Sequence, residues 1–468
     1  MVLRRHMVPV AVQSLLLLKS SSVLGDGAGE SSGGASLILA MLARDEESLL
    51  RRHLPEWRYL ADAFVLGVDS RTLDRSEEVA REVLSPAPTE TYKFEFTGFG
   101  PAKSRLLEEA FARFPDMEYV LLVEPDMRPL PQTIDRSMLN SRELVYAIRR
   151  SGKESRGVRL ADSIFKNNGG WRFEFRVHET PVYRRPPGGF GVPAHIKDSG
   201  WTVVELEGSA RDAQARAMKL ENEMNLVDLD LKDFPGHPRL LYYAGSLRYE
   251  LALELLSASP QAEAGSVSSS SKGPAALAGD RVLRLSQKAA KLLERRARDP
   301  GNAKEGSNSP NAEYVQQRTV AAYYCARTHA DLLGDLRLAE RWYRRTIKLE
   351  ADFLYAHVAL THLLFKGKRY EEALSVSLAG LDAGKPRMRL FMDSAPLHMC
   401  DVPLLVSKAL YYHYSTPHLR PKLSELDVWK RREELLQQCD RECPVHAGES
   451  AGRKLKDVKQ LLQFWEAE

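Results

Sequence analysis

Short, fully apolar runs alternate with amphipathic segments along the first half of the chain. Three runs have the length and composition of strands buried on both faces of a sheet: 36–42, 63–68 and 119–123. Three segments carry apolar residues at helical spacing: 48–60, 75–84 and 99–114. Residues 92–96 alternate in polarity as a further strand does. This order predicts an α/β domain built on a mixed, mostly parallel, Rossmann-like sheet.

From residue 210 onward the pattern changes to helices alone. Amphipathic helices are predicted at 213–234 and 239–256, and two similar helices begin near Ala339 and Ala373. These two alanines lie 34 residues apart, which is the period of tetratricopeptide repeats. We therefore expect an all-α, superhelical array. Its concave face either binds a protein or another long ligand, or the array only supports the α/β domain or a dimer.

Two segments interrupt this helical pattern. Residues 257–280 and 299–312 are rich in Ser, Gly, Pro and Asn and are too polar to bury a core, so they are predicted to be disordered insertions. The predicted organisation is a leader (1–34), an α/β domain (35–209) and a helical domain (210–468).

The charge balance and the cysteine content exclude several classes of protein. Lys and Arg number 67 and Asp and Glu 63, so the net charge of +4 is small for 468 residues, and nucleic acid is not expected as a partner. Four cysteines are too few for a disulfide scaffold. A hydrophobic content of 43% fits a globular chain and argues against a multi-span membrane protein.

The apolar run 7–18 near the N-terminus is shorter than the roughly 20 residues that cross a bilayer, so no integral membrane span is expected. It is either part of a secretory or organellar signal or an unstructured leader. The absence of Asn-x-Ser/Thr acceptors and the four thiols favour a cytoplasmic location.

Acidic residues follow three of the predicted strands. Asp45 and Glu46 come after the first strand, Asp69 ends the second, and Glu124 and Asp126 follow the run 119–123. In open α/β sheets, ligands bind outside the carboxyl ends of the strands, so these acids are expected to meet at one crevice. Such carboxylates call for a divalent cation, a ribose or a base. Alternatively, they only cap the helices that follow.

Downstream, Arg172 and Arg176 alternate with Phe173 and Phe175, which predicts a strand with one basic and one apolar face. The Gly- and Pro-rich residues 188–201 are predicted to form a flexible loop near the site.

Four stretches, in their order and spacing, resemble a known family: LILAMLARDEESLLRRHL, FVLGVDSRTLDRSEEVA, FGPAKSRLLEEAF and YVLLVEPDM. They look like the N-terminal half of family 2 glycosyltransferases of the GT-A fold. The stretch IFKNNGGWRFEFRVHETPVYR is similar to the Arg-Phe-x-x-x-x-His-Glu segment of the subgroup that carries C-terminal tetratricopeptide repeats. The resemblance covers residues 36–210.

The resemblance implies a UDP-linked nucleotide sugar as donor. Asp45 and Glu46 would flank the nucleotide pocket, and Asp69 would hydrogen-bond the uracil or the ribose. Lys103 and Arg105 would lie near the donor or its phosphates, and the basic face of the strand predicted above would also meet the diphosphate.

The resemblance also implies a Mn²⁺ or Mg²⁺ ion held by Asp126 and Glu124. Glu179 would act as general base on the hydroxyl of an unknown acceptor, with His178 beside it or as an additional metal ligand. The implied reaction is an inverting, metal-assisted glycosyl transfer.

Two departures from the family pattern leave other functions open. Pro125 stiffens the acidic pair, and residues 70–73 lack the glycines that let the backbone approach a nucleotide. The main alternative is a non-catalytic tetratricopeptide scaffold or interaction protein with a degenerate transferase domain. Nucleotidyl transfer is a third possibility, disfavoured because no Gly-rich basic loop follows the first strand.

Overall fold

The computed structural model describes residues 34–140, 142–152, 158–185, 189–191, 196–205, 213–258, 274–299 and 311–383, together with 406, 430, 432–435 and 437. The chain divides into two units, 1–34 and 35–468, and every element below belongs to the second. Residues 1–33 of the predicted leader lie outside the described residues.

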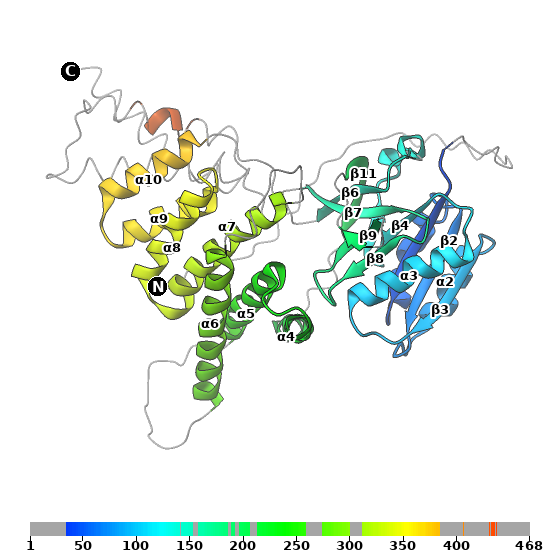
Figure 1. Ribbon diagram of the computed structural model, residues 1–468, viewed down its shortest axis with the longest axis horizontal. Helices are drawn as coiled ribbons and strands as arrows, with labels where there is room; N and C mark the ends of the chain where they lie inside the picture. Colours follow the sequence, from blue (N-terminus) through cyan, green and yellow to red (C-terminus); the bar gives the residue numbers. More distant parts are fainter. Residues whose placement is uncertain are drawn as a thin grey trace. The chain divides into compact units, whose positions relative to one another are not determined.

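The first part of the second unit alternates strands with helices, as predicted (Figure 1). Its first elements are β1 (Leu37–Ala43), α1 (Glu47–Trp57), β2 (Ala63–Asp69), α2 (Ser76–Leu84), β3 (Thr89–Phe94), α3 (Phe99–Arg113) and β4 (Tyr119–Val123). The strands that follow are β5 (Met127–Pro129), β6 (Val145–Gly152), β7 (Val158–Lys166), β8 (Trp171–Glu174), β9 (Thr180–Arg185), β10 (Gly189–Gly191) and β11 (Lys197–Glu205).

The large sheet is mixed and mostly parallel, which confirms the predicted fold class at this level. Its strand order is β3-β2-β1-β4-β7-β6-β11-β5. Strands β3, β2, β1 and β4 are parallel neighbours, and β11 is parallel to β6. Strand β7 runs antiparallel to both of its neighbours, and β5 runs antiparallel to β11.

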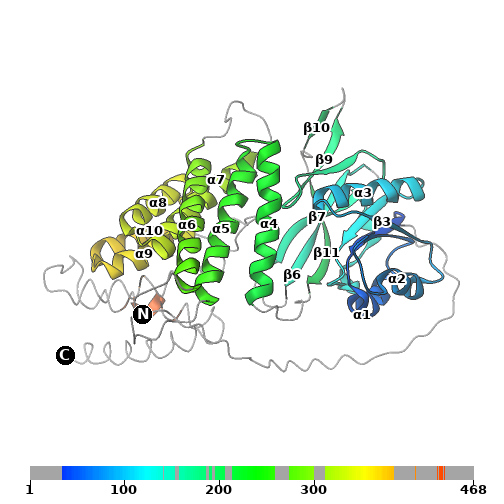
Figure 2. The ribbon, with the colours of Figure 1, turned by 90° about the horizontal axis from the view of Figure 1, so that it is seen from below.

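Helices cover both faces of this sheet (Figure 2). Alternate residues of β1 enter different cores, because successive side chains of a strand point to opposite faces. Leu37, Leu39 and Met41 pack with residues of α1 and α2, whereas Ile38 and Ala40 pack with residues of α3. The strands are thus buried on both sides, which explains their fully apolar sequences.

A second, three-stranded sheet has the order β10-β9-β8 and corrects one prediction. The strand predicted to carry both Arg172 and Arg176 ends at Glu174, because Phe175 has a φ of 71°, in the left-handed region. Arg176 therefore does not share the face of Arg172.

The segment predicted as a flexible loop at 188–201 is also different in the structure. Its last residues belong to β11, which lies between β6 and β5 in the large sheet. Ser199, Trp201 and Val203 alternate along β11 and are buried, so one face of the strand lies in the core despite the glycine at position 200. A strand with one such glycine is easily mistaken for a loop.

The remaining described elements are helices that pack in sequence order (Figure 1). They are α4 (Ala213–Asp233), α5 (Pro238–Ala258), α6 (Pro274–Arg298), α7 (Asn311–Thr328), a π-helical turn (His329–Leu333), α8 (Leu336–Leu349), α9 (Leu354–Lys366) and α10 (Tyr370–Asp382). No helix among these described segments is long and apolar enough to cross a membrane.

The described C-terminal ends of the two predicted insertions are helical. Helix α6 already begins at Pro274, and α7 begins at Asn311, so the ends of both predicted segments are helical. Proline is favoured at the first position of a helix, and the Ala-rich residues that follow Pro274 have high helix propensity. Residues 259–273 and 300–310 lie outside the described residues.

Small residues set the spacing of the helices. Ala339 of α8 and Ala373 of α10, the pair that marks the 34-residue period, are both fully buried. A Cβ atom added to Gly245 would lie 2.5 Å from Leu293, and one added to Gly380 would lie 3.0 Å from His357. A side chain at either glycine would therefore crowd the neighbouring helix, so the two glycines allow close packing at these points.

Candidate functional site

The predicted acids lie at one edge of the large sheet. Strands β1, β2 and β4 are parallel, so their carboxyl ends share that edge. Asp45 and Glu46 follow β1, Asp69 ends β2, and Glu124 and Asp126 follow β4. The topology thus brings five predicted site residues to the same end of the sheet.

Hydrogen bonds tie the first two of these segments together. The Oδ1 atom of Asp45 accepts from the backbone N–H of Leu73 at 2.7 Å, and the N–H of Glu46 donates to the Ser76 Oγ at 2.8 Å. Asp45 has a φ of 53°, a left-handed conformation that costs energy for a residue with a side chain. The turn after β1 is therefore held in shape by the loop after β2.

Asp69 is the most buried of the five acids, with 3% of its surface exposed. Arg71 donates to it from Nε at 3.0 Å and from Nη2 at 2.6 Å. These hydrogen bonds hold the pKa of Asp69 below its usual value, although burial acts in the opposite direction. The Arg71 side chain is 48% exposed, so this buried carboxylate is ionised behind a guanidinium that faces solvent.

The acids after β4 are less enclosed. The Glu124 side chain is 51% exposed and lies 3.4 Å from Arg150, while Asp126 is half-buried. Within the described part of the chain, no group of three or more His, Cys, Asp and Glu side chains is placed to hold a metal ion. The predicted trio of Glu124, Asp126 and His178 is thus not gathered, and metal binding stays a prediction.

The two predicted basic residues of α3 face different partners. Lys103 forms a close ion pair with Glu179, and their side chains are 22% and 14% exposed. Burial alone would raise the pKa of Glu179, but the charge and hydrogen bond of Lys103 outweigh burial and lower it. Arg105 instead pairs with Glu109 along the same helix. The structure therefore joins Lys103 to the predicted base and leaves Arg105 apart.

His178 lies beside Glu179 in sequence but packs against helices α4 and α5. Its ring stacks on Tyr243 with centroids 3.8 Å apart and an interplanar angle of 3°. The Nε2 atom is buried without a hydrogen-bond partner among the described residues, and it lies 3.9 Å from Glu223. Burial lowers the pKa of His178 to about 4, so the ring is neutral at pH 7.

Arg176 and Arg172 also have partners within the protein. The Arg176 guanidinium pairs with Asp230 and Asp233 of α4, each at 2.7 Å. Arg172 pairs with Glu174 at 3.1 Å, and its guanidinium carbon lies 3.8 Å from the centroid of the Phe190 ring. Arg172 and Arg176, which were predicted to form one basic face for a diphosphate, therefore lie in two different environments.

Tyr243, Glu223 and Asp230 are neighbours of these residues that the sequence pattern does not predict. Asp230 is 1% exposed, yet it lies in an amphipathic helix that carries several other acids of the same two types, all less buried than it. Nothing local in the sequence distinguishes it, because its partner is 54 positions away.

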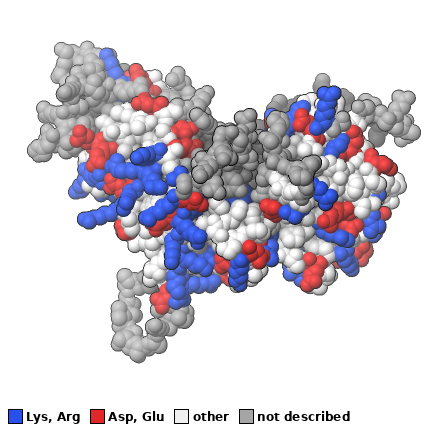
Figure 3. Space-filling view, viewed as in Figure 1, with Lys and Arg blue, Asp and Glu red and all other residues white. Residues whose placement is uncertain are grey.

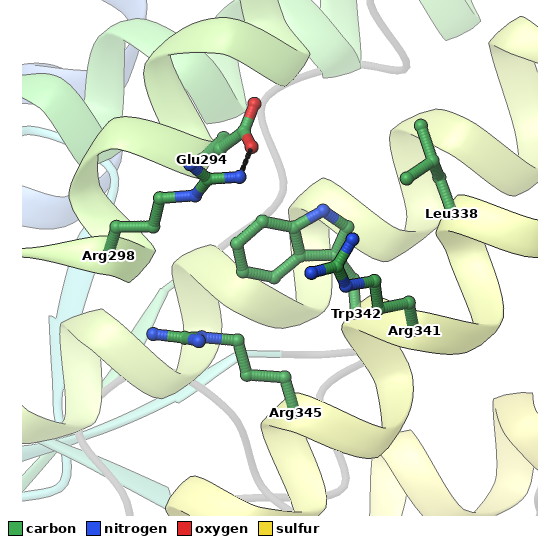
Figure 4. Close-up of a pocket in the computed structure, with 6 residues that line it drawn as sticks. All are labelled: Glu294, Arg298, Leu338, Arg341, Trp342 and Arg345. Carbon is green, nitrogen blue, oxygen red and sulfur yellow. Dashed lines mark ion pairs between the residues drawn. The ribbon is translucent and has the colours of Figure 1, made fainter.

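A pocket of about 320 Å³ between α6 and α8 was not predicted from the sequence either (Figure 4). Six residues line it: Glu294, Arg298, Leu338, Arg341, Trp342 and Arg345. Figure 4 shows the Trp342 ring at the centre of this lining, with arginine side chains around it. The sequence signal that could have indicated this pocket is the spacing of basic residues, Arg341 and Arg345, around Trp342 in α8.

Comparisons with known proteins place few constraints on these sites. No known family model matches the chain, and no curated protein matches its sequence. Similar solved structures include MamA (10% identity, TM-score 0.29, covering 50% of this chain and 98% of that one). They also include YrrB, described as a TPR protein with an unusual peptide-binding site (15%, 0.28, 52% and 89%), and BtubC from P. vanneervenii (11%, 0.28, 54% and 93%). These TM-scores carry no structural argument, so the interpretation of the helical part depends on its own packing.

Proposed function

We propose that this protein is an interaction protein whose helices α4–α10 form a tetratricopeptide-like array that binds a partner protein. The observation that carries the proposal is the repeated close packing of the array. Ala339 and Ala373 are buried at the 34-residue period, and Gly245 and Gly380 let adjacent helices approach closely. Each helix pair depends on its neighbours for burial, and such arrays offer extended surfaces for partners.

Cross-linking of the full chain in extracts of its source cells tests this proposal. We expect a partner that co-purifies in fixed proportion, with its cross-links to this chain falling within residues 213–383. A matched full-chain variant with a charge change in the α/β part, Asp116→Asn, is expected to retain the partner. Cross-links confined to residues 35–205 would contradict the proposal.

A second candidate function is nucleotide-sugar-dependent glycosyl transfer in the α/β part. The observation that favours it is the shared sheet edge of Asp45, Asp69 and Asp126, together with an Asp69 carboxylate kept ionised behind the exposed Arg71. An ionised carboxylate accepts hydrogen bonds from ribose hydroxyls or from a uracil N–H, and a guanidinium suits a diphosphate. Both functions are compatible in one chain, with the array presenting the acceptor.

In this second function, Glu179 would accept the proton of the acceptor hydroxyl. The acceptor oxygen would then bond to the anomeric carbon as the nucleoside diphosphate leaves. Lys103 stabilises the ionised form of Glu179, which keeps it able to accept a proton but makes it a weak base.

The residues at the end of β4 have the donor chemistry for Mg²⁺ or Mn²⁺, which prefer oxygen ligands. Asp126 and Glu124 would hold the ion, and Glu124 would first have to leave Arg150. When bound, the ion would offset the charge of the departing diphosphate. Two carboxylates from one turn leave most of its ligand positions to the donor and to water.

A panel of nucleotide sugars with Mn²⁺ tests the second function on the full chain. Donor binding is measured by calorimetry, and turnover is measured as released nucleoside diphosphate. We expect Asp69→Asn to weaken donor binding and Asp126→Asn to remove turnover. The control is Asp116→Asn, an exposed acid before β4, at the opposite edge of the sheet. If no donor binds, or if Asp126→Asn behaves like the control, this candidate is excluded.

A further inference from the structure

Helix α8 carries a row of basic side chains that have no acidic partner. Arg337, Arg341, Arg345 and Lys348 follow one another at intervals of four, four and three residues, so they share one side of the helix. Among the described residues, none of the four forms an ion pair with a carboxylate. Like charges at this spacing repel one another, so the row is a cost to the isolated helix.

The neighbouring flank of the same helix is neutralised. Arg344 pairs with Glu340 and Glu372, and Arg369 at the start of α10 pairs with the same two acids. The protein therefore contains a closed network of two arginines and two glutamates directly beside the unpaired row. The contrast between the neutralised flank and the unpaired row indicates that the row is available to an acidic partner.

The pocket between α6 and α8 opens beside this row. Trp342 is 5% exposed, and the guanidinium carbons of Arg345 and Arg298 lie 5.5 Å and 6.0 Å from its ring centroid. The Nε atom of Arg345 is buried and has no hydrogen-bond acceptor among the described residues. A ligand oxygen in the pocket would supply that acceptor.

The lining also determines the kind of anion. Leu338 and Trp342 place apolar surface next to the guanidinium groups, and Glu294, which pairs with Arg298, adds a negative charge to the wall. A phosphate group has a higher charge density and would be repelled more strongly by Glu294 than a carboxylate would. Carboxylates next to apolar side chains suit all parts of the lining, since arginine binds carboxylates in bidentate geometry.

We propose that the α6–α8 pocket and the basic row of α8 bind a peptide segment of a partner protein that combines acidic with apolar residues. Figure 3 shows Lys and Arg side chains gathered over the helices on this part of the chain. The pocket takes an apolar side chain against Trp342 and a carboxylate on Arg345, while Arg337, Arg341 and Lys348 meet further carboxylates. This inference rests on the proposed interaction function and specifies its ligand.

Fluorescence polarisation with the full chain tests this proposal directly. The probe is a labelled peptide of repeated Glu-Asp-Glu-Leu units, and the comparison peptide replaces its acids by Gln and Asn. We expect the acidic peptide to bind, more weakly as salt is raised, and the neutral peptide not to bind. Equal binding of the two peptides would overturn the proposal.

Two variants with the same change in net charge distinguish an effect of the pocket on binding from an effect of the overall charge. Arg341→Glu with Arg345→Glu is expected to weaken binding by about tenfold or more. Lys366→Glu with Lys368→Glu makes the same change in net charge at two exposed positions, the last residue of α9 and the loop after it, and is expected to change binding less than about twofold. Circular dichroism of both variants confirms that they fold. Equal losses in the two variants would overturn the proposal.

A single-stranded oligonucleotide serves as the competing class of polyanion. If it binds more tightly than the acidic peptide and loses its binding in the Arg341→Glu, Arg345→Glu variant, the site is a nucleic-acid site and the peptide proposal is wrong. If neither probe binds while a partner still cross-links within residues 213–383, only the pocket proposal fails. If the cross-links fall elsewhere, the proposed interaction function fails.

Discussion

The Lys103–Glu179 pair allows a quantitative test of the interior of the α/β part. We predict that Lys103→Met destabilises the protein at pH 7, because it leaves a largely buried carboxylate without its counter-charge. Breaking one half of a buried ion pair costs 3–5 kcal/mol in typical proteins. Both side chains retain some exposure, so we expect the low end of this range, about 3 kcal/mol.

The pH dependence of this loss follows from the direction of the pKa shift. In the native protein the pKa of Glu179 is lowered, so the pair contributes stability above the unfolded-state pKa and loses it as the pH falls through the folded-state pKa. Without Lys103, burial raises that pKa instead. Protonation of Glu179 then removes the unpaired charge from the variant. The loss of unfolding free energy relative to the wild type should therefore be smaller at about pH 4 than at pH 7.

Urea unfolding followed by hydrogen exchange in peptides covering α3 measures this deficit where Lys103 is located. The double variant Lys103→Met, Glu179→Leu is the control, and we expect it to recover stability to within about 1 kcal/mol of the wild type. A deficit that is the same at both pH values and is not recovered in the double variant would refute the explanation by an unpaired buried charge.

Three further predictions concern positions elsewhere in the described chain. The pKa of His178 is about 4 in the folded protein and near 6.5 when unfolded, so the free energy of unfolding should fall as the pH drops through this window. The variant His178→Phe should remove roughly 3 kcal/mol of that loss, as measured by unfolding at one pH above and one pH below the window. Gly100→Ala should lower the free energy of unfolding in urea by about 2 kcal/mol or more, because the new Cβ would lie 1.9 Å from the Phe175 carbonyl oxygen. Gly279→Ala lies in open space within α6 and should raise the free energy of unfolding by up to about 1 kcal/mol. Trp57→Phe should cost about 2 kcal/mol in the same assay, because it removes a buried hydrogen bond to a backbone carbonyl.

The strand and helix pattern of residues 36–123 was predictable because each element carries its own period. The prediction of a strand at 119–123 coincides with β4, and the predicted helix 75–84 differs from α2 by one residue. The later strands were harder to predict. β8 stops where Phe175 adopts a positive φ, and β11 contains Gly200, so local composition suggested other boundaries.

The positions of the candidate site residues were predictable only where the strand topology alone determines them. Parallel neighbours bring Asp45 and Asp69 to one edge, and a sequence pattern suffices to foresee this. The partners that set the charge state of each group could not be foreseen, because they depend on long-range contacts. Glu179 meets a lysine 76 positions away, and the ring of His178 stacks on a tyrosine from a helix beyond the predicted boundary at 209.

The contacts of the segment 175–179 bear on how the chain can be divided for experiments. Arg176 is held by two aspartates of α4, Arg239 of α5 donates to the backbone carbonyl of His178 at 3.0 Å, and Tyr243 covers the histidine ring. A fragment ending at residue 209 would lose all of these partners and expose Val177, which is buried against the helices. Expression of the two halves as separate fragments is therefore expected to give insoluble or misfolded protein, and point variants of the intact chain are the suitable way to assign a function to either part.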